Sequence, residues 1–371
     1  MTDFQSLPTG TVLVDDYRVE RVLGAGGFGV TYLATELEVD RYVTIKEYFP
    51  SDFATRNKDL EAVPRSQNSR DDYQWGLDRF IDEARVLGKF DHTNIVKLYR
   101  YFRANNTAYM VLHFEEGQSL KSWLKGLGRT PLQKELDELV GPLLDALAVV
   151  HGADFLHRDI APDNIIIRTD GSPVLIDFGS ARGEIAHHTR TISALVKPGY
   201  SPYEQYAETG KKQGPWTDIY AFAGTLYHAV TGKRPPDSPS RVIKDELKPA
   251  LDASNAKYRA AFLEAIDRGL RLDIDSRPQT IAAWRGELLR LPSAENTGWF
   301  DRWSGRADSG NGQGAGLTQP TRKLTEIATT PLPPDVPQPE GGFIDFVAGL
   351  KQRNRQRDAA GAPADQADEP A

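Results

Sequence analysis

The chain contains no cysteine, which excludes disulfide bridges, thiolate metal sites and cysteine nucleophiles. It also has no excess of positive charge, and its formal net charge of −7 excludes the electrostatic footprint of a nucleic-acid-binding protein. No basic stretch followed by an apolar run opens the chain, so it shows no secretory signal. The most apolar stretch, residues 139–150, is interrupted by Asp145 and is too short to span a bilayer. We therefore expect a cytoplasmic protein without a transmembrane segment.

The composition predicts a folded globular part followed by a flexible tail. The 371 residues are 39% hydrophobic and 26% charged, as in folded domains. Residues 1–16 are interpreted as a leader, and residues 292–371 are rich in Gly, Pro and Thr, which predicts a flexible tail. Residues 342–357 are a candidate basic amphipathic helix. Candidate phosphorylation sites that a phosphothreonine-reading partner would bind are Thr321, Thr325, Thr329 and Thr330, and an inert linker is the alternative.

The order of the predicted elements indicates the fold class. Apolar periodicity predicts strands at 17–23, 30–34, 42–46, 95–102 and 108–114, with a helix at 71–90. Beyond residue 114, helices are predicted at 120–124, 132–151, 218–231 and 259–270, with a strand pair at 165–167 and 174–176. Strands followed by helices predict a bilobal α+β fold, with an N-lobe at about 17–113 and a C-lobe at about 114–291.

A glycine-rich string, GAGGFG, lies between two predicted strands and contains Gly24, Gly26 and Gly29. Glycines let backbone N–H groups approach phosphate oxygens, although a plain tight hairpin has the same pattern. A dinucleotide-binding fold is disfavoured because a strand, not a helix, follows the glycines. On the next strand, Lys46 ends the string VTIK, and Glu83 on the following predicted helix could pair with it. Such a pair would hold the ammonium over nucleotide phosphates.

The most specific signal is HRDIAPDN, from His157 to Asn164, followed closely by DFG, from Asp177 to Gly179. A carboxylate, an amide five residues later and a second carboxylate supply one base and two Mg²⁺ ligands. Phosphoryl transfer needs little more, because its catalysis is mostly positioning and charge neutralisation. With these motifs the chain resembles the protein kinase family over about residues 17–291. The strings LPTGTVL, IKEYFP and KPGYSPYEQY make it similar to the bacterial, eukaryotic-like Ser/Thr kinases.

The resemblance implies roles for single residues. Lys46 would contact the phosphates of ATP with Glu83 as its partner, and Asp159 would be the catalytic base. Asn164 and Asp177 would bind Mg²⁺, the only metal expected. Leu112 falls at the gatekeeper position, before the hinge. The residues implied to surround the nucleotide are Leu23, Gly24, Ala25, Gly26, Gly27, Phe28, Gly29, Val30, Thr31, Thr44, Lys46, Leu112, His113, Glu115, Ser119 and Ile166.

Other matches imply structural roles in the C-lobe. Glu204 and Arg277 would form a buried ion pair, and Asp218 would brace the catalytic loop. The apolar spine that aligns the two lobes would consist of Leu87, Leu98, His157 and Phe178.

Three departures from the family pattern bear on activity. The family's lysine two residues after the catalytic aspartate is Ala161, and its threonine before P-G-Y is Lys197. Either the lost cation lowers or abolishes activity, or Lys197 supplies the cation beside Asp159. The alternative for Lys197 is a side chain that points to solvent or to a substrate residue. Thr31 and Thr44 replace the two apolar residues over adenine, which predicts a modest loss of nucleotide affinity.

Arg158 implies regulation by phosphorylation, because arginine at this position pairs with a phosphate on the activation loop in the family. Thr189, Thr191 and Ser193 are the candidate sites, and an ordinary polar loop is the alternative. The function expected from the resemblance is ATP-dependent phosphorylation of Ser or Thr in protein substrates, including the kinase itself. A pseudokinase scaffold that binds nucleotide is the main alternative, and a small-molecule kinase of similar fold is a second.

Overall fold

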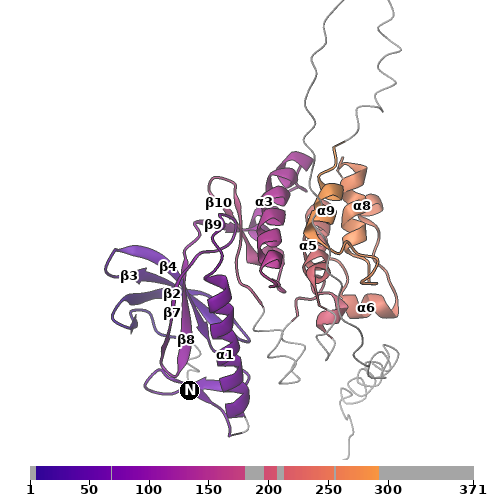
Figure 1. The fold of residues 1–371 in the computed structure, drawn as a ribbon. Helices are drawn as coiled ribbons and strands as arrows, with labels where there is room; N and C mark the ends of the chain where they lie inside the picture. Colours follow the sequence, from indigo (N-terminus) through magenta and orange to yellow (C-terminus); the bar gives the residue numbers. More distant parts are fainter. Residues whose placement is uncertain (1–5, 68, 180–195, 207–212, 255, 292–371) are drawn as a thin grey trace, which may run out of the picture. The chain divides into compact units, whose positions relative to one another are not determined.

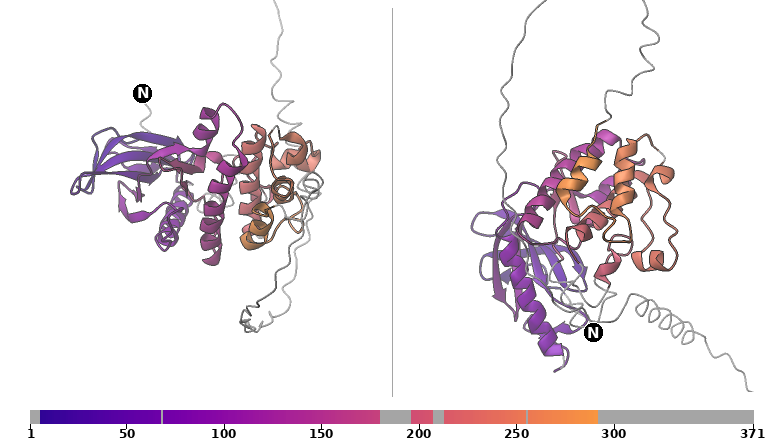
Figure 2. Two further views of the ribbon diagram at one scale, coloured as in Figure 1. Left: turned by 90° about the horizontal axis from the view of Figure 1, so that it is seen from above. Right: turned by 45° about the vertical axis from the view of Figure 1, so that its right-hand side comes forward.

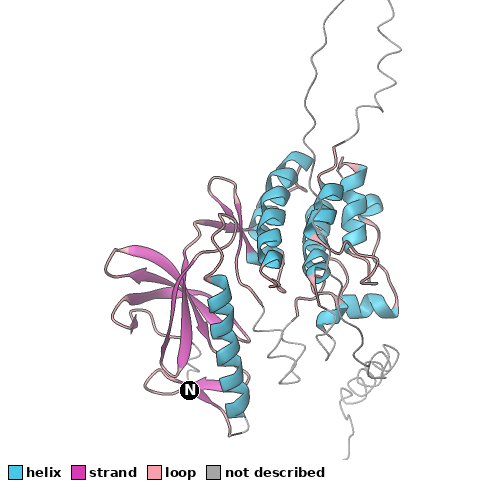
Figure 3. Cartoon of the chain, viewed as in Figure 1, coloured by secondary structure: helices cyan, strands magenta, loops and turns pink. Residues whose placement is uncertain are grey.

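The computed structural model describes residues 6–67, 69–179, 196–206, 213–254 and 256–291. The predicted phosphorylation sites Thr189, Thr191 and Ser193, and every prediction made for residues 292–371, lie outside this part. Within it, strands and one long helix gather in one region, and the remaining helices gather in another (Figures 1 and 3). The same separation is visible in two further directions (Figure 2). The predicted α+β fold with two lobes is therefore confirmed.

The N-lobe is an antiparallel sheet with the strand order β1-β2-β3-β4-β8-β7. Its strands are β1 (Val12–Leu13), β2 (Tyr17–Gly26), β3 (Gly29–Glu36), β4 (Arg41–Tyr48), β7 (Leu98–Ala104) and β8 (Thr107–His113). Helix α1 (Ser69–Leu87) packs on β7 and β8. Its buried residues include Tyr73, Leu77, Phe80, Ala84 and Leu87, which recur every three or four positions and so form one face.

Both faces of this sheet are covered, which the sequence did not indicate. The face that carries Tyr32 packs against the N-terminal segment, where Leu7 is buried and its N–H donates to the Tyr32 hydroxyl at 3.0 Å. A hairpin of β5 (Ala54–Arg56) and β6 (Ala62–Pro64) lies on the same face. The described part of the predicted leader is thus packed into the N-lobe. It escaped prediction because a two-residue strand has no readable periodicity.

The C-lobe begins with a small sheet of β9 (Gly117–Ser119), β10 (Ile165–Arg168) and β11 (Pro173–Leu175). Its helices are α2 (Leu120–Gly126), α3 (Gln133–Gly152), α5 (Pro215–Thr231), α6 (Ser238–Ile243), α7 (Ala250–Ala253), α8 (Ala260–Gly269) and α9 (Ile281–Leu288). The described residues of this lobe also include the 3₁₀ turns η1 (Pro162–Asn164) and η3 (Tyr203–Gln205). No helix in the described residues is long and apolar enough to cross a membrane.

Helix α5 is the centre of the C-lobe, and nearly all of its residues are buried. Pro215 opens the helix, and Gly232 ends it with φ of +70°, a backbone conformation that glycine adopts without a steric penalty. Helices α6, α7 and α9 were not predicted, because they are at most eight residues long and give too few turns for a clear helical pattern.

Candidate active site

Lys46 on β4 lies on the sheet face opposite to the face that carries Tyr32. In the pairing of β3, β4 and β8, Thr31 is opposite Lys46, and Thr44 is opposite Leu112. Because side chains alternate along a strand, these four residues share one face. Phe28 and Val30, both predicted to touch the nucleotide, have their side chains in the hydrophobic core. Val30 alternates with Thr31 along β3, so its side chain points away from the Lys46 face and its backbone is the part that a ligand there can reach.

Lys46 contacts one carboxylate from each lobe. Its Nζ lies 3.4 Å from Glu83 Oε1 on α1 and 3.5 Å from Asp177 Oδ1 in the DFG string. Lys46 and Glu83 are buried, whereas the Asp177 side chain is 26% exposed. A buried ammonium between two carboxylates is held in one place, and the more exposed carboxylate is the one that solvent and ligands can reach.

The catalytic-loop string places its carboxylate and its amide together. Asn164 Nδ2 donates to Asp159 Oδ2 at 2.7 Å and to the Asp159 carbonyl oxygen at 2.8 Å. These bonds occupy the amide nitrogen of Asn164, so its Oδ1 is the atom left to bind a ligand. Gly179 fits against Asp159, because a Cβ there would lie 2.7 Å from the Asp159 Cβ. Close packing against Gly179 therefore helps to position Asp159, in addition to the hydrogen bonds from Asn164.

The donor set fits magnesium. Asn164 offers an amide oxygen and Asp177 a partly exposed carboxylate, both hard oxygen ligands of the kind that Mg²⁺ takes together with phosphates and water. The described residues contain no cluster of three or more acidic or histidine side chains that would bind a metal without such a phosphate. Asn164 and Asp177 would hold Mg²⁺ together with nucleotide phosphates and water.

The catalytic loop is braced by Asp218 from the start of α5. Its Oδ2 accepts the N–H of His157 at 2.9 Å, and its Oδ1 accepts the N–H of Arg158 at 2.8 Å. Arg158 has φ of +63°, in the left-handed region, so these bonds stabilise a strained backbone. His151 Nε2 also contacts Asp218, at 2.8 Å, a partner that the sequence did not reveal. Burial opposes ionisation of Asp218, but the hydrogen bond and charge of His151 and the hydrogen bond from the Arg158 N–H leave its pKa lowered.

Of the residues proposed as a spine, His157 lies against Phe178. The ring of Phe178 lies 4.4 Å from that of His157, centroid to centroid, with the two planes tilted by 31°. Burial lowers the pKa of His157, which keeps its imidazole neutral. Leu87 is buried on α1, and Leu98 packs against the core from β7. A neutral imidazole among apolar groups is consistent with a packing role rather than proton transfer.

Lys197 is directed at the catalytic aspartate. Its Nζ lies 3.3 Å from Asp159 Oδ1, and its side chain is 28% exposed. Ala161, which occupies the family's lysine position, is fully buried and carries no charge. Among the described residues the cation beside Asp159 therefore comes from the segment before P-G-Y.

The remaining predicted nucleotide contacts lie at the hinge, the floor and the glycine turn. Leu112 and His113 end β8, and Glu115 lies between β8 and β9. Ser119 on β9 pairs with Ile166 on β10, and these two residues form the floor of the predicted nucleotide site. The exposed end of the glycine hairpin comprises Leu23, Gly24, Ala25 and Gly26, with Gly27 half-buried at the turn.

Arg168 is a site residue that sequence reasoning missed. Its Nε donates to Glu115 Oε2 at 2.7 Å, and its Nη1 donates to the Thr93 carbonyl oxygen at 3.0 Å. Arg168 on β10 thus ties the hinge to the segment after α1. No local pattern could have revealed this contact, because Arg168 is 53 residues from Glu115.

The predicted ion pair of the C-lobe is present. Arg277 Nη1 lies 2.6 Å from Glu204 Oε1, and both side chains are buried. The guanidinium also donates to the carbonyl oxygens of Arg271 and Leu272, so it is well satisfied. This pair fixes the end of the activation segment to the C-lobe.

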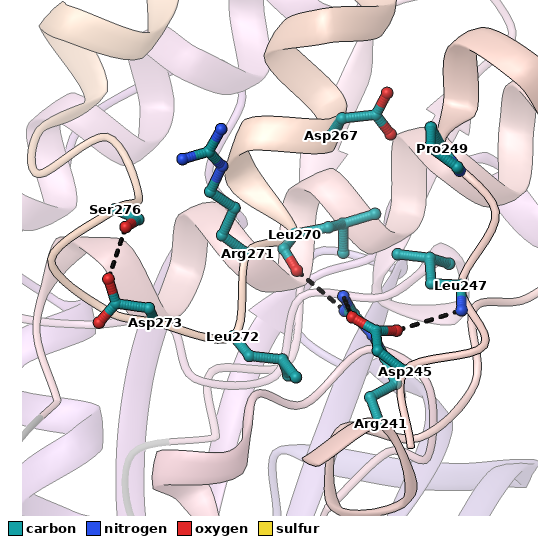
Figure 4. A pocket seen from close by; sticks show the side chains of 10 residues that line it. All are labelled: Arg241, Asp245, Leu247, Pro249, Asp267, Leu270, Arg271, Leu272, Asp273 and Ser276. Atoms are coloured by element: carbon teal, nitrogen blue, oxygen red, sulfur yellow. Dashed lines mark hydrogen bonds and ion pairs between the residues drawn. The ribbon is translucent and has the colours of Figure 1, made fainter. Parts of the chain in front are cut away.

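A cavity of about 360 Å³ lies in the C-lobe between α6, α7 and the end of α8 (Figure 4). It contains none of the predicted site residues. Several of its polar groups bond one another, with Arg241 paired to Asp245 and Ser276 bonded to Asp273. The catalytic assignment therefore rests on the convergence of Lys46, Asp159, Asn164 and Asp177, not on this cavity.

Comparisons with known proteins agree with this geometry. The family model of the protein kinase domain matches residues 17–278. The chain is 35% identical over 233 residues to the serine/threonine-protein kinase PknA of Nostoc sp., covering 60% of this chain and 38% of that protein. It is 32% identical over 296 residues to serine/threonine-protein kinase D of Synechocystis sp., covering 76% of this chain and 53% of that protein. The chain thus spans about half the length of these relatives, or less.

A solved structure described as the apo form of PpkA-294 is also similar. It shares 37% sequence identity and a TM-score of 0.69, and the match covers 76% of this chain and 99% of that one. The family model covers well over half of the residues, and the structural match extends over both lobes. By its motifs, its fold and these relatives, the chain belongs to the protein kinase family.

Proposed function

We propose that this protein is an ATP-dependent serine/threonine kinase that transfers the γ-phosphoryl group of MgATP to protein hydroxyls. The observation that carries the proposal is the convergence of Lys46, Asp159 and Asp177, with Asn164 bonded to Asp159. The relatives named serine/threonine-protein kinase support the choice of acceptor.

Each residue has a role that follows from its position. Lys46, held by Glu83, would neutralise charge on the α- and β-phosphates. Bound Mg²⁺ would supply further neutralisation of phosphate charge. Asp159 would orient the acceptor hydroxyl and accept its proton as the oxygen attacks the γ-phosphorus and the bond to ADP breaks. Arg158 remains a proposed partner for a phosphate on the activation segment.

Lys197 would supply the cation that stabilises the transferred phosphoryl group. The contact between its Nζ and Asp159 Oδ1, at 3.3 Å, puts its charge next to the acceptor and within reach of a γ-phosphate. A pseudokinase scaffold is the rival, and it is disfavoured because the lysine, both carboxylates and the Mg²⁺-binding amide are all present. The reaction is assigned to the cytoplasm, where ATP is available, with proteins as substrates.

The test is incubation of the full chain with MgATP, followed by mass spectrometry of phosphorylated residues, beside the variant Asp159→Asn. We expect phosphoserine or phosphothreonine on the wild-type chain and loss of that signal in the variant, because the amide cannot accept the hydroxyl proton. Nucleotide binding without any transfer by the wild type, on itself or on a general protein substrate, would favour the scaffold instead.

A further inference from the structure

The turn of the glycine-rich hairpin is bonded to the segment that follows β4. The carbonyl oxygen of Gly27 accepts the N–H of Ser51 at 3.1 Å, and that of Phe28 accepts the N–H of Phe49 at 3.0 Å. The turn of a hairpin normally presents such carbonyls to water. Here two successive carbonyls of the phosphate-binding loop are tied to a third stretch of backbone.

The loop also packs closely on this stretch. A Cβ at Gly29 would overlap with the carbonyl oxygen of Glu47, so only glycine allows the approach. The Phe28 side chain is buried in the hydrophobic core. The loop thus has backbone bonds, a side-chain anchor and a close contact that all fix it in one place.

The stretch that holds the loop is itself anchored by a buried ion pair. Arg56 on β5 lies 2.7 Å from Glu47 at the end of β4, and both side chains are fully buried. The hydroxyls of Tyr32 and Tyr109 donate to the same carboxylate at 2.7 and 2.8 Å. The Arg56 guanidinium also lies over the ring of Phe49, 4.5 Å from its centroid. A buried charge pair with several hydrogen bonds has a defined geometry, so Arg56 anchors residues 49–66 to the sheet.

The same stretch reaches the helix that carries Glu83. The Tyr48 hydroxyl donates to the carbonyl oxygen of Tyr73 on α1 at 3.2 Å, and its carbonyl accepts the hydroxyl of Thr107. Residues 47–51 therefore contact the phosphate-binding loop through their backbone and α1 through the Tyr48 side chain.

We propose that residues 49–66 form a clasp that holds the phosphate-binding loop in position before nucleotide binds. The Ser51 N–H and the Arg56 side chain are its positioning groups. The proposal rests on the proposed function, in which this loop binds the phosphates of ATP. A free glycine loop must be ordered when its ligand arrives, which weakens binding, whereas a loop ordered during folding avoids that loss of affinity.

The test removes one clasp donor without touching the ion pair. The Phe53 N–H bonds to the Pro50 carbonyl oxygen at 3.1 Å, which makes Ser51 the second residue of a turn, a position that favours proline. Ser51→Pro deletes the N–H that bonds to Gly27, and Ser51→Ala is the matched control that keeps it.

We expect Ser51→Pro to bind a non-hydrolysable ATP analogue with Mg²⁺ about 2–10-fold more weakly, the range for one lost hydrogen bond. Ser51→Ala should match the wild type in calorimetric titrations. Hydrogen exchange at the Phe49 amide should be faster in the proline variant than in the alanine variant, with similar melting temperatures.

A second variant tests the clasp in case Ser51→Pro does not fold. Arg56→Lys keeps a cation on Glu47 but loses the two-pronged contact, so it should change affinity and Phe49 exchange in the same direction. Unchanged affinity and exchange in either folded variant would overturn the clasp. If the wild type binds no nucleotide at all, the proposed function fails, and the exchange comparison alone still decides whether the clasp exists.

Discussion

Lys197→Ala is expected to slow phosphoryl transfer by about 10²–10³-fold, the usual effect of removing one preorganised charge partner from a transition state. The affinity for MgATP should stay within about twofold, because ground-state binding rests on Lys46, the glycine loop and the hinge. The reason is geometric: Lys197 Nζ lies 3.3 Å from Asp159 Oδ1, whereas Ala161 offers no charge. Rates under saturating ATP, paired with calorimetric titration of the nucleotide, measure both quantities.

A cation swap is the sharper control for this prediction. The double variant Ala161→Lys, Lys197→Thr restores the arrangement usual in the family and should recover at least about tenfold of the rate lost in Lys197→Thr alone. Lys244→Ala, which removes an exposed lysine paired with Glu246, should leave the rate unchanged. Full activity of Lys197→Ala would remove Lys197 from the mechanism.

Arg277→Met is expected to lower the free energy of unfolding by about 3–5 kcal/mol, because it leaves the buried carboxylate of Glu204 without its charge partner. The Arg277 guanidinium bonds both Glu204 oxygens, at 2.6 and 3.2 Å, and three backbone carbonyls. Methionine fills similar space but satisfies none of these groups. Guanidinium titration of the full chain, followed by tryptophan fluorescence, provides the measurement.

The matched control is the same substitution at an exposed pair. Arg103 lies 3.2 Å from Asp78, and their side chains are 58% and 49% exposed. Arg103→Met should change the free energy of unfolding by about 1 kcal/mol or less, since water screens such pairs. Equal effects of the two substitutions would show that burial does not set the strength of the Arg277 pair.

The local strings of the sequence determined the family and the chemistry. In HRDIAPDN the carboxylate proposed as the catalytic base and the amide are five residues apart, so a short loop brings Asn164 Nδ2 to 2.7 Å from Asp159 Oδ2. The alternation of strands and the helical spacing on α1 likewise depend on neighbouring residues, and they predicted the two lobes. Such patterns are readable because their partners are close in the chain.

Only the tertiary structure decided which distant groups support the site. The bonds from residues 49 and 51 to the glycine loop, the contact of Arg168 with Glu115 and that of His151 with Asp218 join positions from 21 to 67 residues apart. The packing of the N-terminal segment on the sheet is likewise a contact between residues that are far apart in the chain. No local pattern in the sequence marks these partners, because they come together only when the chain folds. The sequence therefore determined which residues can do the chemistry, and the packing of distant segments determined how firmly they are held.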